Sequence, residues 1–224
     1  MLANIVVEFF LKGGPVMYPI LICAVVAVAV VGERAFWWMR ESNRRDPKKL
    51  EDVLAALEAS DIEAAIKLSE GVDDPVIRMI YRGLNHVNTS LEGALQLAAG
   101  IELERAGRFL TVMDTLVTLA PLLGLLGTVT GLMRAFLNVG SAELSVVAVT
   151  GGIGEALIAT ACGLGIAIFS LVPFNYFTKR ATRLQFELET AATNVEVMLK
   201  ASKGNGINLP PATSPMPAAA RLPR

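Results

Sequence analysis

Glu155 is the residue of this chain whose type and position most clearly permit chemistry. It stands near the start of an apolar stretch from Gly151 to Phe177, and no other ionisable side chain follows in that stretch before Tyr176. A carboxylate in such a segment is costly and is normally tolerated only when it faces a helix bundle or a water-filled path. The position therefore indicates a membrane protein that handles protons or cations. It equally permits a carboxylate near the membrane surface that pairs with water, a lysine or an arginine.

Two threonines are candidates to act with this carboxylate. Thr160 follows Glu155 by five residues, a rotation of about 140° on an α-helix, so the two side chains point in different directions. Thr160 instead belongs to a stripe of small and polar residues, which is Ala156, Thr160, Gly163, Ala167 and Ser170. If this stripe faces a central lumen, Thr128 of the preceding apolar segment completes a ring of hydroxyls with Thr160. The alternative is that each threonine bonds to a carbonyl of its own helix.

Composition places the chain among membrane proteins. Of its 224 residues, 53% are hydrophobic and 18% are charged, and the formal net charge is −1. Membrane-spanning helices explain this hydrophobicity, and the charge gives no basic field for nucleic acid. Cys23 and Cys162 lie in apolar runs and are interpreted as small hydrophobes, while the lone His86 has no companion at metal-ligand spacing. We therefore expect no metal, no cofactor and no enzymatic activity, since no set of nucleophile, base and orienting group is visible.

The elements that position these residues form an all-α membrane protein with three transmembrane helices and long cytoplasmic helical extensions. Each of three apolar runs is long enough to cross a bilayer, which takes about 20 residues. The predicted segments are a periplasmic interfacial helix (1–14), transmembrane helix 1 (15–38), a cytoplasmic helical region (39–108), transmembrane helix 2 (109–137), a periplasmic loop (138–150), transmembrane helix 3 (151–177), a cytoplasmic helix (178–201) and a disordered tail (202–224).

Glycines are predicted to pack the second and third transmembrane helices closely. Gly124, Gly127 and Gly131 recur at spacings of three and four residues in the second, and Gly163 lies in the third. Small residues let helix backbones approach in a membrane, where no hydrophobic drive brings helices together. The pattern predicts that these two helices line the lumen of a ring.

Lysine and arginine predict the orientation. They concentrate after the first span, before the second and after the third, while Lys12 and Arg134 lie toward the opposite side. Cytoplasmic loops carry the excess of basic residues. The N-terminus is therefore expected outside, in the periplasm, and the C-terminus inside, in the cytoplasm.

Three blocks of this sequence resemble the MotA/TolQ/ExbB proton channel family, and ExbB most closely. The blocks are Gly13-Gly14-Pro15-Val16-Met17-Tyr18-Pro19-Ile20 with Glu33-Arg34, then Pro121-Leu122-Leu123-Gly124-Leu125-Leu126-Gly127-Thr128-Val129-Thr130-Gly131-Leu132-Met133, and Gly152-Ile153-Gly154-Glu155-Ala156-Leu157-Ile158-Ala159-Thr160-Ala161. The resemblance covers about residues 1–200. Thr130 stands where many members, TolQ types especially, have tryptophan, which favours ExbB. A Gly replaces a Pro common before the third block, and Pro173 comes later than the family pattern predicts.

The resemblance implies a homo-oligomeric ring, expected to be a pentamer, in the bacterial inner membrane. The ring would surround the transmembrane helices of an ExbD-like or TolR-like partner dimer, and proton flow would drive a TonB-like energy transducer. Glu155 matches the family's membrane carboxylate, Thr128 and Thr160 match its pore-lining positions, and the proton-carrying aspartate belongs to the partner. The alternatives are a TolQ-like motor for envelope maintenance and a non-conducting helical scaffold. MotA, with four spans and a larger cytoplasmic domain, fits less well.

Overall fold

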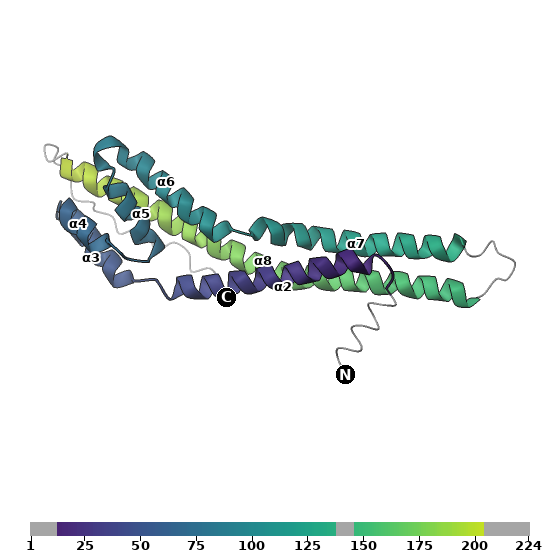
Figure 1. The fold of residues 1–224 in the computed structure, drawn as a ribbon. Helices are drawn as coiled ribbons and strands as arrows, with labels where there is room; N and C mark the ends of the chain where they lie inside the picture. The colour runs from purple at the N-terminus through teal and green to yellow at the C-terminus, as the bar shows by residue number, and fades with distance from the viewer. Residues whose placement is uncertain (1–12, 138–145, 204–224) are drawn as a thin grey trace, which may run out of the picture.

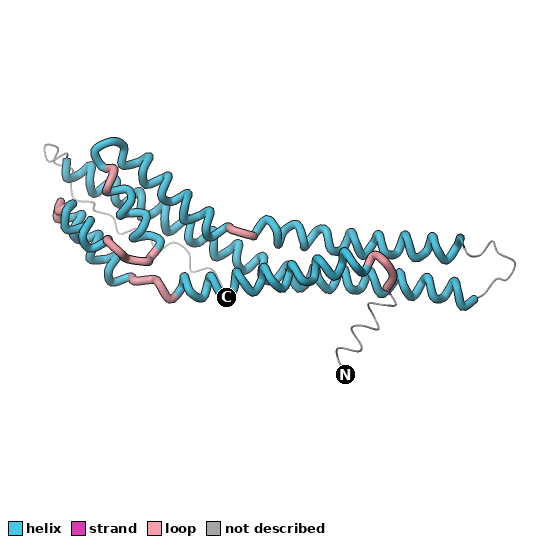
Figure 2. Tube along the Cα trace, viewed as in Figure 1, coloured by secondary structure: helices cyan, strands magenta, loops and turns pink. Residues whose placement is uncertain are grey.

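The computed structural model describes residues 13–137 and 146–203, and every regular element among them is an α-helix (Figures 1 and 2). The all-α class is thereby confirmed. The described helices are α2 (Met17–Ser42), α3 (Pro47–Glu58), α4 (Ile62–Ser69), α5 (Pro75–Leu84), α6 (Val87–Gly107), α7 (Leu110–Leu137) and α8 (Val146–Lys203).

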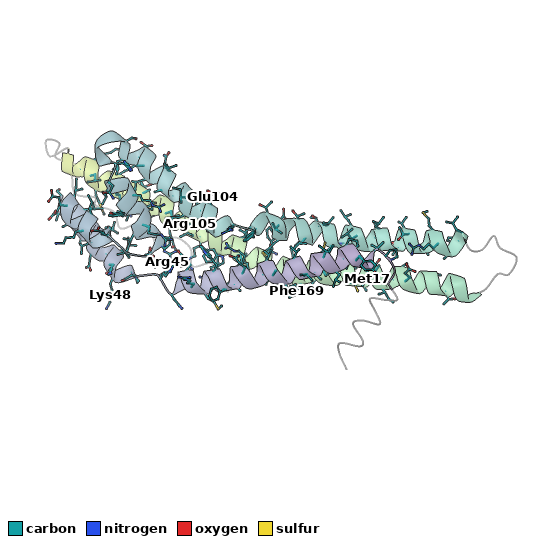
Figure 3. The ribbon with its side chains drawn as sticks, viewed as in Figure 1. Met17, Arg45, Lys48, Glu104, Arg105 and Phe169 are labelled. Carbon is teal, nitrogen blue, oxygen red and sulfur yellow. The ribbon has the colours of Figure 1, made fainter. Side chains whose placement is uncertain are left out.

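The molecule is elongated, with a different kind of packing at each end (Figure 1). At the narrow end α2, α7 and the first half of α8 lie side by side. At the other end α3, α4, α5 and α6 surround the second half of α8. Charged side chains such as Lys48 and Glu104 gather at the bundle end, whereas Met17 and Phe169 lie along the narrow end (Figure 3). The two ends therefore match a membrane-spanning part and a water-exposed part.

Three helical stretches are long and apolar enough to cross a membrane. They lie within Met17–Ser42, Ser90–Leu137 and Thr150–Ala201. Many of their large apolar side chains are exposed, among them Ile22 at 64%, Leu122 at 61% and Val172 at 68%. Apolar surface of this extent on a soluble monomer is rare, so these faces are suited to lipid or to other helices.

The helix ends do not coincide with the predicted segment boundaries. α8 is one helix of 58 residues that continues through both the predicted third span and the predicted helix 178–201. It begins at Val146, so residues 146–150 of the predicted loop are helical, and α2 continues past residue 38 to Ser42. α8 continues as one helix even though Pro173 lies inside it. The predicted interfacial helix and tail fall almost wholly on residues outside the described part.

A buried arginine holds the junction between α6 and α7. The chain breaks there because Phe109 adopts a positive φ of 64°. Arg34 of α2, 1% exposed, donates from Nη1 to the carbonyl oxygens of Arg105 and Ala106 at 3.1 and 3.4 Å. These carbonyls belong to the last turn of α6, where no helical N–H is available to them. Arg34 thus connects α2 to the end of α6.

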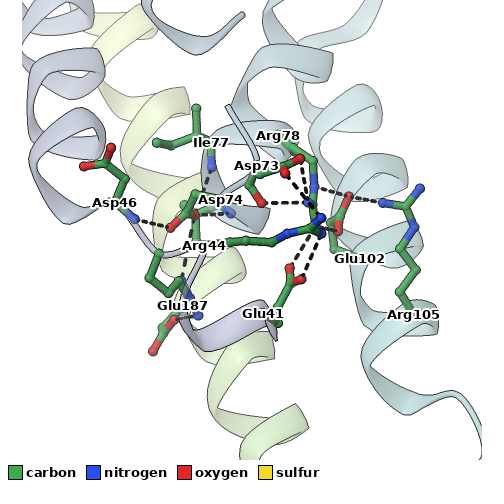
Figure 4. Close-up of polar contacts among 12 residues, drawn as sticks. Glu41, Arg44, Asp46, Asp73, Asp74, Ile77, Arg78, Glu102, Arg105 and Glu187 are labelled. Atoms are coloured by element: carbon green, nitrogen blue, oxygen red, sulfur yellow. Dashed lines mark hydrogen bonds and ion pairs between the residues drawn. The ribbon is translucent and has the colours of Figure 1, made fainter. Parts of the chain in front are cut away.

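A second polar network joins α2 to the helical bundle (Figure 4). Arg78 of α5 donates from Nη2 to Glu102 of α6 at 2.6 Å and to Glu41 of α2 at 3.0 Å. Glu102 is 2% exposed and Glu41 is 5% exposed. Burial lowers the pKa of Arg78, but its hydrogen bonds and charge interactions with Glu102 and Glu41 outweigh burial, so the pKa is raised overall. Arg78 therefore stays charged at neutral pH and holds both carboxylates.

Candidate functional site at the junction of three segments

Glu155 forms an ion pair with an arginine of the neighbouring helix. Nη1 of Arg134 on α7 donates to Oε1 of Glu155 on α8 at 3.1 Å. The Glu155 side chain is 25% exposed and the Arg134 side chain is 51% exposed. The carboxylate is thus half-buried and compensated within the same chain, which agrees with the second of the two environments that its position permitted.

The turn before α2 is a third segment that lies against the same carboxylate. The turn of Gly13, Gly14 and Pro15 leads into α2, and Gly14 has a φ of +72°. A Cβ atom on Gly14 would lie 1.7 Å from Oε1 of Glu155, so the carboxylate occupies the space that any side chain there would need. The turn is anchored by Val16, which packs with Ala159 of α8 in one apolar cluster. Glycine is therefore required at position 14 for both its backbone angle and its lack of a side chain.

The two threonine hydroxyls are placed differently from each other. Thr160 donates across the helix pair to the carbonyl oxygen of Gly124 on α7 at 2.9 Å. Thr128 donates to the carbonyl of Leu125 in its own helix at 2.7 Å. Each hydroxyl proton is used, but each hydroxyl oxygen keeps acceptor capacity. Thr128 and Thr160 are both half-buried, so neither hydroxyl is sealed in the packed core of the chain.

The stripe that contains Thr160, for which a lumen was one possible partner, packs against α7 in this chain. Ala156 is 2% exposed and a Cβ atom on Gly131 of α7 would meet its Cβ at 3.0 Å. A Cβ atom on Gly163 would lie 2.5 Å from the carbonyl oxygen of Ala120 on α7. The stripe is covered by α7, because small residues permit contact within the chain as readily as between chains.

The predicted packing glycines all meet the opposite helix. A Cβ atom on Gly124 would lie 3.0 Å from the Cα atom of Thr160, and one on Gly127 would lie 2.4 Å from the Cβ atom of Ala159. A Cβ atom on Gly131 would lie 3.0 Å from the carbonyl oxygen of Gly152. These approaches involve backbone or Cβ atoms, which cannot move aside. The four glycines thus fix how α7 and α8 pack and thereby set Arg134 against Glu155.

Comparison with known proteins identifies the family. The sequence profile of the MotA/TolQ/ExbB proton channel family matches residues 71–190. This chain belongs to that family. The match contains all of α7 and the part of α8 that carries Glu155 and Thr160.

Several relatives carry ExbB names. A biopolymer transport protein of Synechocystis named ExbB-like 3 is 38% identical over 80% of this chain and 87% of its own length. A second Synechocystis protein, ExbB-like 1, is 40% identical over 74% of this chain and 67% of its own length. The biopolymer transport protein ExbB of Neisseria meningitidis is 28% identical over 85% of this chain and 94% of its own length. The predicted likeness to ExbB is therefore confirmed.

Sequence reasoning missed how Arg134 and Gly14 act on Glu155. Both residues were visible: Arg134 as a basic residue on the side opposite to most of the others, and Gly14 in the first block of the resemblance. Their link to Glu155 depends on a helical hairpin and on the return of the N-terminal turn, neither of which sequence spacing encodes. Asp114, an exposed carboxylate in the predicted second span, was also passed over.

The site offers a carboxylate and hydroxyl oxygens rather than a metal cage. Within residues 13–137 and 146–203, no group of three or more histidine, cysteine, aspartate or glutamate side chains is arranged to hold a metal ion. The arrangement permits the partner of Glu155 to be exchanged: another cation, or a protonated group, can replace Arg134 at the carboxylate. Arg134 occupies one carboxylate oxygen, and any group that enters must compete with it.

Proposed function

We propose that this chain is an ExbB-like subunit of an inner-membrane motor driven by the proton-motive force. It would couple proton flow with an ExbD-like partner to energise TonB-dependent transport across the outer membrane. Membership of the proton channel family and the ExbB names of its relatives support this proposal. The observation that carries it is the half-buried Glu155 at the meeting point of α7, α8 and the turn before α2.

The proposed working form is a ring, taken to be a pentamer, around a partner dimer. In this arrangement the chain spans the inner membrane three times, with its N-terminus in the periplasm and its C-terminus in the cytoplasm. The exposed apolar face of α7 supports assembly with other helices, since Leu125 is 58% exposed and Val129 is 52% exposed. Neighbouring subunits, the partner's helices and lipid would divide this surface among them.

In the proposed mechanism Arg134 is the resting counter-charge of Glu155. When a partner helix brings a cation or a protonated group to the site, that group competes with Arg134 for the carboxylate. When Glu155 separates from Arg134, its side chain would also move away from Gly14. A change of the charge at this site would thereby change how the turn before α2 packs. Thr128 and Thr160 would supply acceptor oxygens along the same path.

The decisive experiment is Glu155→Gln in cells that depend on proton-driven uptake through the outer membrane. Glutamine keeps the size of the side chain and one acceptor oxygen but removes its charge, so we expect normal membrane levels and partner binding with uptake abolished. Glu104→Gln, an exposed glutamate of α6, is the matched control and should leave uptake unchanged. Full uptake in Glu155→Gln would remove the support for a motor.

A non-conducting scaffold is the second candidate, and the intrachain ion pair of Glu155 with Arg134 favours it. In a scaffold this pair only holds α7 to α8, so replacing both partners by neutral residues of similar shape should be tolerated. The double variant Glu155→Gln with Arg134→Gln separates the two functions. A scaffold retains activity in this variant, whereas a motor loses it because the charge itself is needed.

A TolQ-like role differs from an ExbB-like role in the process that the motor drives. Cells lacking this chain should fail in TonB-dependent uptake if the proposal holds, and should instead leak periplasmic proteins if the motor maintains the envelope. Complementation with the wild-type chain in both assays assigns the role.

A further inference from the structure

A groove between α2 and α8 has the chemistry of a phosphate site. Its cavity of about 450 Å³ is lined by Ala35, Trp38, Met39, Ser42, Asn43, Tyr176, Phe177 and Arg180. The residues that line the groove include hydrogen-bond donors from arginine, hydroxyl and amide groups, and no carboxylate. A cavity of about 350 Å³ shares Trp38, Ser42 and Arg180 with it. That second cavity is lined by Arg45 and Arg183 but also by three carboxylates, Glu41, Asp74 and Glu187, so the groove itself is the better place for an anion.

Arg180 is the cation of this groove and has no carboxylate partner among the described residues. It is exposed, and its Nε and Nη2 atoms donate to the Tyr176 hydroxyl at 3.1 and 2.9 Å. Its guanidinium lies over the Trp38 ring, 6.0 Å from the centroid. By contrast, Arg45 and Arg183 in the adjoining cavity both pair with Glu187. Arg180 is thus positioned by aromatic rings, with its charge uncompensated and Nη1 available.

The wall of the groove also holds an unused donor. Trp38 is 8% exposed, and its indole N–H has no hydrogen-bond partner among the described residues. A buried donor without an acceptor is costly, and native proteins rarely leave one. The nitrogen itself is buried, so an acceptor from outside the chain reaches it only if the Trp38 side chain shifts, and Arg180 is the donor that the groove presents.

The groove lies where a lipid headgroup would lie. Residues 38 and 177 are the predicted ends of the first and third spans, and the basic residues that follow them define the predicted cytoplasmic side. About one helical turn before Met39 and Tyr176 of the groove, Phe36 is 65% exposed and Val172 is 68% exposed. Donors at the membrane surface therefore stand beside apolar side chains within it, and basic pockets between transmembrane helices on the cytoplasmic side bind anionic headgroups.

We propose that this groove binds the phosphodiester of an anionic phospholipid, with Arg180 as the principal contact. The inference does not depend on the proposed motor function. Phosphate chemistry is shared by a lipid headgroup and by free phosphate, and the apolar residues on the membrane side favour the lipid.

The test uses the purified full-length chain in mild detergent and measures its thermal unfolding as ligand is added. The probes are short-chain phosphatidylglycerol, short-chain phosphatidylcholine and inorganic phosphate. Because ligand that binds the folded state raises Tm, phosphatidylglycerol should raise Tm more than the other two at equal concentration. An equal effect of inorganic phosphate would overturn the lipid assignment, and no effect of phosphatidylglycerol would overturn the site.

Variants separate this site from general attraction to a basic surface. Arg180→Gln should weaken apparent affinity for phosphatidylglycerol by about tenfold, the worth of a charge-assisted hydrogen bond. Lys179→Gln makes the same charge change on the adjacent exposed residue outside the groove and should leave affinity unchanged. Arg180→Lys keeps the charge and should retain part of the affinity, which guards against a folding defect. Equal losses in Arg180→Gln and Lys179→Gln would contradict the proposal.

Discussion

At the scale of the residue, Glu155 is defined by what surrounds it. Arg134 supplies a positive charge at 3.1 Å, and Gly14 leaves the space that the carboxylate fills. An exposed ion pair contributes little on its own, typically below 1 kcal/mol. The contact with Gly14 is steric and does not weaken with salt. The lack of a side chain at Gly14 therefore leaves room for the carboxylate, and the ion pair with Arg134 is the polar contact that orients it.

Gly14→Ala should destabilise the chain by more than backbone strain explains. A positive φ in a residue other than glycine costs about 1 to 3 kcal/mol, and the added Cβ must also displace Glu155. Gly71 has the same φ of +72° with no atom within 4 Å of its Cβ position, so Gly71→Ala measures strain alone. Thermal unfolding should show the larger loss for Gly14→Ala. In a Glu155→Ala background the two losses should become similar.

A persistent excess for Gly14→Ala in the Glu155→Ala background would contradict the predicted contact. In that case another neighbour of the turn, rather than the carboxylate, would account for the effect.

At the scale of the element, the pairing of α7 with α8 positions the site. The stripes of small residues on the two helices pack against each other, and Thr160 donates a hydrogen bond to the carbonyl oxygen of Gly124. Membrane helices associate through close packing and such polar contacts rather than through the hydrophobic effect. Arg134 reaches Glu155 because this packing fixes the register of the hairpin.

Gly163→Ala should therefore loosen the hairpin, whereas Gly165→Ala should not. A Cβ on Gly163 would lie 2.5 Å from a backbone carbonyl oxygen of α7, while the Cβ position of Gly165 has no atom within 4 Å. Overpacking of this kind costs about 1 to 3 kcal/mol, but alanine at an open helical site is neutral or stabilising. Thermal unfolding in mild detergent, monitored by circular dichroism, measures the stability of both variants. Equal stability of the two variants would show that α7 and α8 pack differently.

At the scale of the whole molecule, polar contacts join the membrane end to the bundle. Arg34 connects α2 to the last turn of α6, and Arg78 connects Glu41 of α2 to Glu102 of α6. α8 passes through both ends as one helix. The helix that carries Glu155 therefore runs on into the bundle without an intervening loop.

The predicted topology is tested by cysteine labelling of intact cells. Single cysteines replace Ser141, Ser60 and Ser202 in a chain whose Cys23 and Cys162 have been changed to alanine. A reagent that cannot cross the inner membrane should modify position 141 and should miss positions 60 and 202, because basic residues hold their segments in the cytoplasm. The reverse pattern would overturn the orientation, and with it the placement of the lipid groove on the cytoplasmic side.

The sequence by itself determined the class, the three apolar helices and the family. Helical periodicity, span length and charge bias are local properties, and the blocks around Gly124 and Glu155 carry the resemblance without any coordinates. The sequence also predicts close helix contact at the glycines of the second and third apolar helices, since small residues at spacings of three and four permit it wherever it occurs.

Only the tertiary structure decided what those glycines contact and what Glu155 faces. The same stripe of small residues fits a lumen, a neighbouring subunit or α7, and spacing does not distinguish these partners. Arg134 and Gly14 lie 21 and 141 residues away from Glu155 in the sequence, and their contact depends on how a hairpin and a returning turn pack. Local patterns fix which face of a helix is buried, but long-range packing fixes against which residues it is buried.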